Sequence, residues 1–200
     1  MKKVLASCAV LGAAASIAGL GTFATFTSST NAAATASTGS VSIALGAAGP
    51  ANRLTLGASG LLPGDTMQRA VDLANNGVAG SDNLAAVTLT TTASPSSLLD
   101  TDATNGLQMK IDSCTNAWTE SGVSPAFTYS CSGTTKSVVA SRAVIGNNIA
   151  LTNLASVAAQ TTDHLLVTLT LPSAAPNTMQ GLSSSLTYTF VGTQRTATNK

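Results

Sequence analysis

The stretch HLLVTLTL, residues 164–171, decides the fold class of this chain, because it is rich in aliphatic and β-branched residues and contains no glycine or proline. A second stretch, LTYTFV at residues 186–191, alternates large side chains with threonine. Strict alternation of this kind predicts a strand with one buried face. A proline-containing loop joins the two stretches, and they therefore resemble a closing pair of strands.

Shorter segments with similar character recur along the chain at intervals of roughly 10–20 residues, which is typical of an all-β domain. They cover residues 41–45, 53–57, 67–73, 84–92, 106–112, 126–131 and 137–140. Turn chemistry separates several of them, as in LLPGD at 61–65 and NNG at 75–77. Residues 147–160 have apolar residues close to helical spacing, so we expect one helix or helical turn there. The pattern predicts an antiparallel β-sandwich with at most one or two short helices.

Composition excludes several classes of function. Charged residues make up only 8% of the 200 residues, against about 25% in an average soluble domain. The net charge of +1 is incompatible with a basic nucleic-acid surface or an acidic solvating tail. The chain has one histidine, few carboxylates and no closely spaced cysteine pair, so most metal and acid–base sites are excluded. We therefore assign no catalytic residue, no metal ligand and no cofactor.

The N-terminus has the layout of a signal peptide. Two lysines precede an apolar, Ala- and Gly-rich run, and the small residue Ala24 offers a cleavage point before Thr25. The alternative is an N-terminal membrane anchor, because the run is long enough to span a bilayer. With cleavage, the protein is secreted and meets the membrane only beforehand. The expected organisation is a signal peptide (1–24), a flexible Ala/Ser/Thr-rich arm (25–40) and a sandwich domain (41–200).

Export agrees with the cysteine content. Two cysteines, Cys114 and Cys131, remain after removal of residues 1–24, an even number in an oxidising compartment. A bridge between them would close a loop worth about 3 kcal/mol of chain entropy. The alternative is a pair of unpaired buried thiols.

Three other features are weak candidates for chemistry. His164 stands alone and is interpreted as a polar residue at a strand end, since one imidazole cannot supply the three protein ligands of a zinc site. Residues 100–106 are rich in oxygen ligands, but the glycine and the twelfth position do not match a calcium loop, so we interpret them as a solvated turn. Trp118 is expected to pack on the disulfide, with ligand stacking as the alternative.

Several blocks resemble a known family. GTFATF at 21–26 resembles the end of signal peptides processed by the SipW-type signal peptidase. GLLPGD at 60–65, followed by a strand and NNG at 75–77, resembles the L-x-P-G-D…N-x-G block of the TasA/camelysin (CalY) family. Gln180-Gly181 and YTFVGTQR at 188–195 resemble the last strand of that family. The resemblance extends from residue 21 to residue 195.

The resemblance implies a secreted, jelly-roll-like β-sandwich of the biofilm-matrix type. Family members of that type form fibres when the N-terminal arm of one subunit completes the sheet of the next, so residues 25–40 would be the donor arm. An exposed sheet edge has unpaired main-chain groups that an extended arm can satisfy. The expected partners are a second copy of the chain and the SipW-type signal peptidase.

Two alternative functions remain open. Other members of the family carry the label camelysin, a surface metallopeptidase, which would predict bound zinc and an essential His164. The third possibility is an extracellular adhesin or binding module. Its ligand would bind near Trp118 and Tyr129, or in the loop at residues 93–105.

Overall fold

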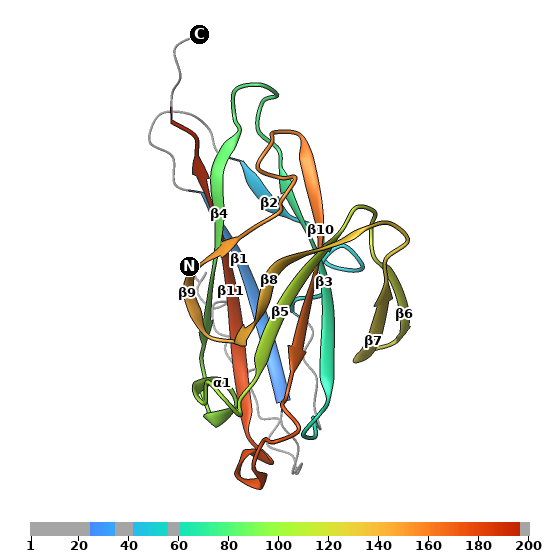
Figure 1. Ribbon diagram of the computed structural model, residues 1–200, viewed down its shortest axis with the longest axis vertical. Coiled ribbons are helices and arrows are strands. Elements are labelled where there is room, and N and C mark those ends of the chain that lie inside the picture. The colour runs from blue at the N-terminus through green and yellow to red at the C-terminus, as the bar shows by residue number, and fades with distance from the viewer. Residues whose placement is uncertain (1–24, 35–41, 56–60, 197–200) are drawn as a thin grey trace, which may run out of the picture.

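The computed structural model of the protein describes residues 25–34, 42–55 and 61–196. Its strands form two stacked sheets with a separate hairpin at the side (Figure 1), and two single helical turns accompany them. The predicted all-β fold with few helices is confirmed. The predicted signal peptide, residues 1–24, lies outside the described residues. The elements are β1 (Thr25–Ala34), β2 (Ile43–Leu45), β3 (Thr66–Asn75), β4 (Leu84–Ala93), α1 (Leu98–Thr101), β5 (Gln108–Cys114), β6 (Thr119–Val123), β7 (Ala126–Ser130), β8 (Thr135–Ala143), β9 (Gly146–Leu151), β10 (Thr161–Thr170), η1 (Asn177–Met179) and β11 (Ser183–Gln194).

The strand order has the character of a jelly roll. One sheet runs β1-β11-β4-β9 and the other β2-β3-β10-β5-β8, so the chain passes repeatedly from one sheet to the other. The hairpin β6–β7 is inserted between two neighbouring strands of the second sheet, β5 and β8. Among the described strand pairs, β1 with β11 is parallel and the other pairs are antiparallel.

The two stretches that decided the fold class form the central strands β10 and β11. In β10 the side chains of Leu165 and Val167 are 0% and 1% exposed, because alternate residues point between the sheets. In β11, which belongs to the other sheet, the same alternation buries the side chains of Leu186, Tyr188 and Phe190. Burial of these side chains from both sheets forms one continuous core.

One pair of residues breaks the alternation. Leu166 and Ala70 lie opposite each other in the β10–β3 pair and point to the outer face of the sheet, yet each is only 4% exposed. The β6–β7 hairpin lies beside β3 (Figure 1) and contacts it, which accounts for the cover on this outer face. The consecutive leucines 165 and 166 are the sequence signal of a strand that is covered on both faces.

The expectation of a helix over residues 147–160 is wrong. Residues Gly146–Leu151 form β9, which pairs antiparallel with β4, and turns follow it. Ile149 and Leu151 are buried because they are two residues apart on a strand, not because they share a helical face. Asn148 and Asn153 have positive φ angles of 50° and 58°, which no α-helix accommodates.

The segment expected to be a flexible arm is a strand over its described part. Residues Thr25–Ala34 form β1 at the outer edge of the four-stranded sheet, next to β11. The physical reason is that β11, paired with β4 on its other side, would otherwise leave a row of unpaired main-chain groups. The remaining residues of the expected arm, 35–40, lie outside the described residues.

The turn LLPGD, residues 61–65, has a clear local cause. In LLPGD, the amide of Asp65 donates to the carbonyl of Leu62 at 2.9 Å, and the Asp65 carboxylate accepts from the Leu62 amide at 2.8 Å. Gly64 has a φ of 98°, which suits the third position of a type II turn. The turn thus brings the chain into β3 in a single defined direction.

Candidate functional site

The N-terminal strand β1 is held in the four-stranded sheet by its parallel pairing with β11. The register runs without a break over ten residue pairs, from Thr25 opposite Ser183 to Ala34 opposite Gly192. The sequence of β1, TFTSSTNAAA, contains one large apolar residue, Phe26. Main-chain hydrogen bonds are therefore the principal recognition that this strand offers to a sheet edge, as in recognition by strand addition.

The disulfide closes the base of the β6–β7 hairpin. Cys114 ends β5 and Cys131 follows β7, and the two are joined with their Cα atoms 5.8 Å apart. The bridge therefore ties together the two ends of the insertion that covers β3.

Charged and aromatic groups attach the same hairpin to the sandwich. Arg53 donates two hydrogen bonds to the carboxylate of Glu120, at 2.9 and 2.7 Å, and its guanidinium lies 4.8 Å from the ring centroid of Phe127. Tyr129 donates its hydroxyl to Glu120 at 2.9 Å. Arg69 is 3% exposed and donates to the carbonyl of Pro125 at 3.1 Å. Bidentate arginine–carboxylate pairs are strong and directional, so the hairpin has one docked orientation.

These contacts change the proton affinities of the groups involved. The hydrogen bond from Arg53 holds the pKa of Glu120 below its usual value. Burial and the hydrogen bond to Glu120 raise the pKa of Tyr129 to about 12. Both shifts favour the protonation states that keep the hairpin attached at neutral pH.

Trp118 and Tyr129, named above as places for a ligand, both have partners within the chain. The indole Nε1 of Trp118 donates to the backbone carbonyl of His164 at 2.9 Å. This bond fixes the segment between the disulfide and the hairpin across the outer face of β10. The structure therefore uses both aromatic residues to attach the hairpin.

His164 is not part of a cluster of metal-binding side chains among the described residues. Its Nδ1 lies 2.6 Å from a carboxylate oxygen of Asp72, which is the residue opposite it on β3. All eight acidic residues and the single histidine of the chain lie within the described residues, and no group of three or more His, Cys, Asp or Glu side chains there is placed to hold a metal ion. A catalytic zinc site needs three protein ligands, so the residues present do not fit one.

The loop at residues 93–105, named above as a place for a ligand, overlaps the oxygen-rich residues 100–106, and both of its carboxylates accept hydrogen bonds from within the loop. Asp100 is 4% exposed and accepts from the Ser96 hydroxyl at 2.6 Å and from the Ser97 amide at 2.7 Å, which caps α1. Asp102 accepts from the amides of Thr104 and Asn105, both at 2.9 Å, and these bonds lower its pKa. Each carboxylate thus has a structural role in a turn.

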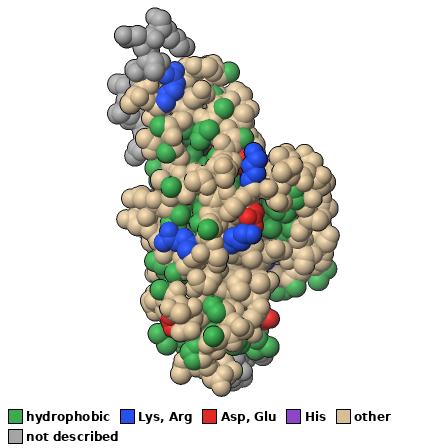
Figure 2. Space-filling view, in the orientation of Figure 1, with side chains coloured by type: hydrophobic (Ala, Val, Ile, Leu, Met, Phe, Trp, Pro, Cys, Tyr) green, Lys and Arg blue, Asp and Glu red, His purple; other side chains and the backbone are tan. Residues whose placement is uncertain are grey.

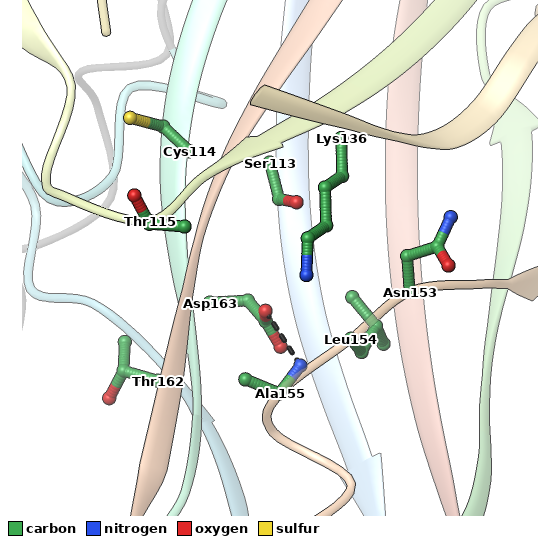
Figure 3. A pocket seen from close by; sticks show the side chains of 9 residues that line it. All are labelled: Ser113, Cys114, Thr115, Lys136, Asn153, Leu154, Ala155, Thr162 and Asp163. Atoms are coloured by element: carbon green, nitrogen blue, oxygen red, sulfur yellow. Dashed lines mark hydrogen bonds between the residues drawn. The ribbon is translucent and has the colours of Figure 1, made fainter. Parts of the chain in front are cut away.

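Sequence reasoning missed a polar cavity near one end of β5, β8 and β10. Ser113, Lys136, Asn153 and Asp163 line it, together with the apolar Leu154 (Figure 3). A signal was present, because Ser113 and Asp163 occupy inward strand positions that alternation reserves for apolar residues. The register that brings them together could not be read from the sequence.

Fold and contacts define the class as a disulfide-bridged, jelly-roll-like β-sandwich that carries a strapped hairpin and an N-terminal edge strand. Within the described ranges, neither helical turn has the length and apolarity that a bilayer crossing requires. The model of the family described as "Camelysin metallo-endopeptidase" matches residues 1–199, and the chain belongs to this family. The search of curated proteins found no match.

Proposed function

We propose that this protein is an extracellular structural protein of the biofilm-matrix type, which self-assembles by donating its N-terminal segment to the sheet of a neighbouring copy. The observation that carries the proposal is the unbroken ten-residue register between β1 and β11. Membership of the camelysin family supports the assignment to this class. The low content of charge, with few Lys, Arg, Asp or Glu side chains on the face seen in Figure 2, also suits a surface that packs against copies of itself.

Exchange of the strand costs little because the same bonds form in either arrangement. A copy of residues Thr25–Ala34 from a second molecule can take the register of β1 on β11 and make identical main-chain hydrogen bonds. Domain swapping of this kind is a low-cost route to association. A head-to-tail contact that does not close on itself produces a filament. Protein concentration then decides between the monomer and the fibre.

Deletion of residues 25–40 tests the proposal. The purified full-length mature chain is expected to scatter light increasingly with concentration and to form filaments in electron micrographs. The deletion variant is expected to stay monomeric while retaining its disulfide and its β-sheet circular dichroism. Filaments from the deletion variant, or monomers from both chains, would overturn the proposal.

A synthetic peptide with the sequence of residues 25–34 gives the matched test. It is expected to bind the deletion variant in a one-to-one complex and to stop filament growth of the full chain. The control peptide carries prolines at alternate positions, which removes main-chain donors. Equal binding of the two peptides would contradict recognition through the main chain.

Export and processing complete the proposal. The SipW-type signal peptidase cleaves between Ala24 and Thr25, which frees the amino end of the segment that becomes β1. N-terminal sequencing of the secreted protein is expected to begin at or near Thr25. A secreted chain that begins at Met1 would contradict this processing.

A further inference from the structure

The cavity beside the β9–β10 turn is built where the inner face of the five-stranded sheet changes from apolar to polar. Along β5, Ile111 is completely buried in the core, and Ser113 is the next residue on the same face. Ser113 lies opposite Lys136 of β8, and Asp163 of β10 points inward two residues before Leu165. Three adjacent strands thus place a hydroxyl, an ammonium and a carboxylate around one space of about 360 Å³. That volume lies in the range of about 300–1,000 Å³ typical of small-molecule sites.

The carboxylate of Asp163 is fixed before any ligand arrives. Asp163 is 6% exposed, and its two oxygens accept hydrogen bonds from the amides of Ala155 and Ser156 at 2.9 and 2.7 Å. These amides belong to the turn after β9, and the bond to Ala155 is drawn in Figure 3. No described basic side chain lies within ion-pair distance of it. Each oxygen has a second lone pair, so the carboxylate remains an acceptor for a hydroxyl group.

Two donors on the other side of the cavity have no partner among the described residues. The Lys136 ammonium forms no ion pair or hydrogen bond there, and neither does the Ser113 hydroxyl, although Ser113 is only 5% exposed. Figure 3 shows both side chains pointing into the space above Asp163. Lys136 is exposed, and the Ser113 hydroxyl is not among the described buried atoms that lack a partner, so both groups face the open cavity, where a ligand can replace water at each of them.

Asn153 and Leu154 form the facing wall. The side-chain amide of Asn153 donates to the carbonyl of Ser137 at 2.8 Å, which fixes the side chain and leaves its oxygen as an acceptor. Leu154 is 8% exposed and adds an apolar surface beside these polar groups. The wall therefore combines one oriented acceptor with a surface for C–H groups.

We propose that this cavity binds a neutral saccharide residue through adjacent hydroxyl groups. One hydroxyl donates to Asp163 and its neighbour accepts from Lys136 and Ser113, while the C–H face of the ring lies on Leu154. The cavity has one positive and one negative charge, so an anion or a cation gains no net attraction. A zwitterion is less suited, because its ammonium group would meet a carboxylate whose two oxygens each already accept an amide hydrogen bond.

Titration of the purified chain with neutral sugars, followed by amide NMR, tests the inference. The probes are hexoses, N-acetylhexosamines and pentoses, each as the free monosaccharide and as a linear oligosaccharide of the same unit. We expect saturable shifts at the amides of Ala155 and Ser156, with an affinity that does not change with salt. Response to the oligosaccharide as well as to the monosaccharide would identify a polysaccharide chain as the source of the residue. Response to the monosaccharide alone would identify a free sugar.

Two variants and one control assign the binding to this cavity. Lys136→Met and Ser113→Ala are each expected to weaken binding by about tenfold, the effect of one lost hydrogen bond to a charged or buried group. Lys110→Met is the control, since Lys110 points to the opposite face of the same sheet and pairs with Asp112. Normal affinity in both cavity variants would overturn the inference, as would equal losses in the control.

Charged probes complete the test. Acetate and free alanine are expected to produce no saturable shifts. Stronger binding of acetate that falls with salt, or of alanine, would overturn the assignment to a neutral saccharide. Absence of saturable shifts with every sugar would do the same. The variant without residues 25–40 is expected to bind the sugar normally, so this result is independent of fibre assembly.

Discussion

Arg53 and Glu120, which are 67 residues apart in sequence, meet in two parallel hydrogen bonds of 2.9 and 2.7 Å. This ion pair, called the clamp below, connects the loop before β3 with β6, the first strand of the hairpin. Its side chains are 23% and 15% exposed, so solvent screening is only partial. This ion pair acts together with the hydrogen bonds of Arg69 and Trp118 in attaching the hairpin to the sandwich.

We predict that Glu120→Gln loosens the hairpin and lowers the free energy of unfolding by about 1 kcal/mol, after allowance for partial exposure. Hydrogen exchange of the β6 and β7 amides is expected to rise more than exchange in β10. Asp112→Asn is the matched control, because Asp112 belongs to an ion pair whose lysine is 49% exposed. Faster exchange in the control than in Glu120→Gln would contradict the clamp.

Acid is expected to weaken the same clamp. Arg53 lowers the pKa of Glu120 in the folded state, so the carboxylate stabilises the fold at every pH above its unfolded value of about 4.3. That contribution is lost as the pH falls through the lower, folded value. Exchange of the hairpin amides measured from pH 6 down to about 3 should increase less in Glu120→Gln than in the unaltered chain. An equal increase in both would exclude Glu120 as the source.

Alkali is expected to act through Tyr129. Burial and the bond to Glu120 raise its pKa to about 12, so the protonated phenol stabilises the fold below the unfolded value of about 10. The contribution declines as the pH rises from there toward 12. Tyr188, the other tyrosine, also has a raised pKa because it is completely buried. Phenolate absorbance of the folded protein should therefore show no step near pH 10. The unfolded chain should titrate there, and a one-tyrosine step in the folded protein would contradict the prediction.

The NNG motif is expected to be essential for the turn after β3. Asn75 is 0% exposed, donates to the carbonyl of Asp82 at 3.1 Å and accepts from the amide of Gly77 at 3.0 Å. Asn75→Ala should lower the free energy of unfolding by about 2 kcal/mol, because both groups lose a buried partner. Chemical denaturation measures this, with the exposed Asn76→Ala as the control. Similar stability of the two variants would show that the Asn75 bonds contribute little.

Gly77→Ala tests the space at the same turn. A Cβ there would collide with Cβ of Asp82 and come within 3.0 Å of the Asn75 side-chain oxygen. Because the neighbours are tied to the main chain, we expect a loss of about 2 kcal/mol or more. Unchanged denaturation would mean that the turn moves freely, which its hydrogen bonds argue against.

Removal of the disulfide is expected to act mainly on the unfolded chain. Cys114→Ser with Cys131→Ser should lower stability by about 3 kcal/mol, since the bridge closes a loop with a sequence separation of 17. Thermal unfolding with and without reductant gives the same comparison in the unaltered chain. Equal melting temperatures would contradict a stabilising bridge.

The sequence predicted those strands correctly whose own residues show the alternating or aliphatic pattern of a strand. The alternation of β11 and the aliphatic run of β10 depend only on which face each residue presents, and both strands are where they were expected. It failed for β9, because the apolar spacing in residues 147–160 fits a helix about as well as a strand followed by a turn. The available edge of β4 decided between them.

Neither the pairing of β1 nor the cavity could be predicted from the sequence pattern. The sequence of β1 has no period, and its pairing is determined by the free side of β11, whose partner residues lie 158 positions further along the chain, as in Thr25 and Ser183. The cavity depends on the register of β5 with β10 and on that of β5 with β8, and the β5–β8 register shifts near Ile111. A one-residue change in that register would turn Lys136 to the other face.

The short β2 and the hairpin beside β3 together determine in which direction the molecule can add neighbours. β2 pairs with only three of the ten residues of β3. Farther along β3, the β6–β7 hairpin covers the outer face of the sheet. A second sheet approaching from that side would meet a bulky, cross-linked obstacle instead of a straight row of amides. Sideways pairing of whole sheets into broad aggregates is thereby discouraged beside β3. Because β1 contacts β2 and so lies at this same edge of the sandwich, growth through exchange of β1 next to β11 would give thin, one-dimensional threads.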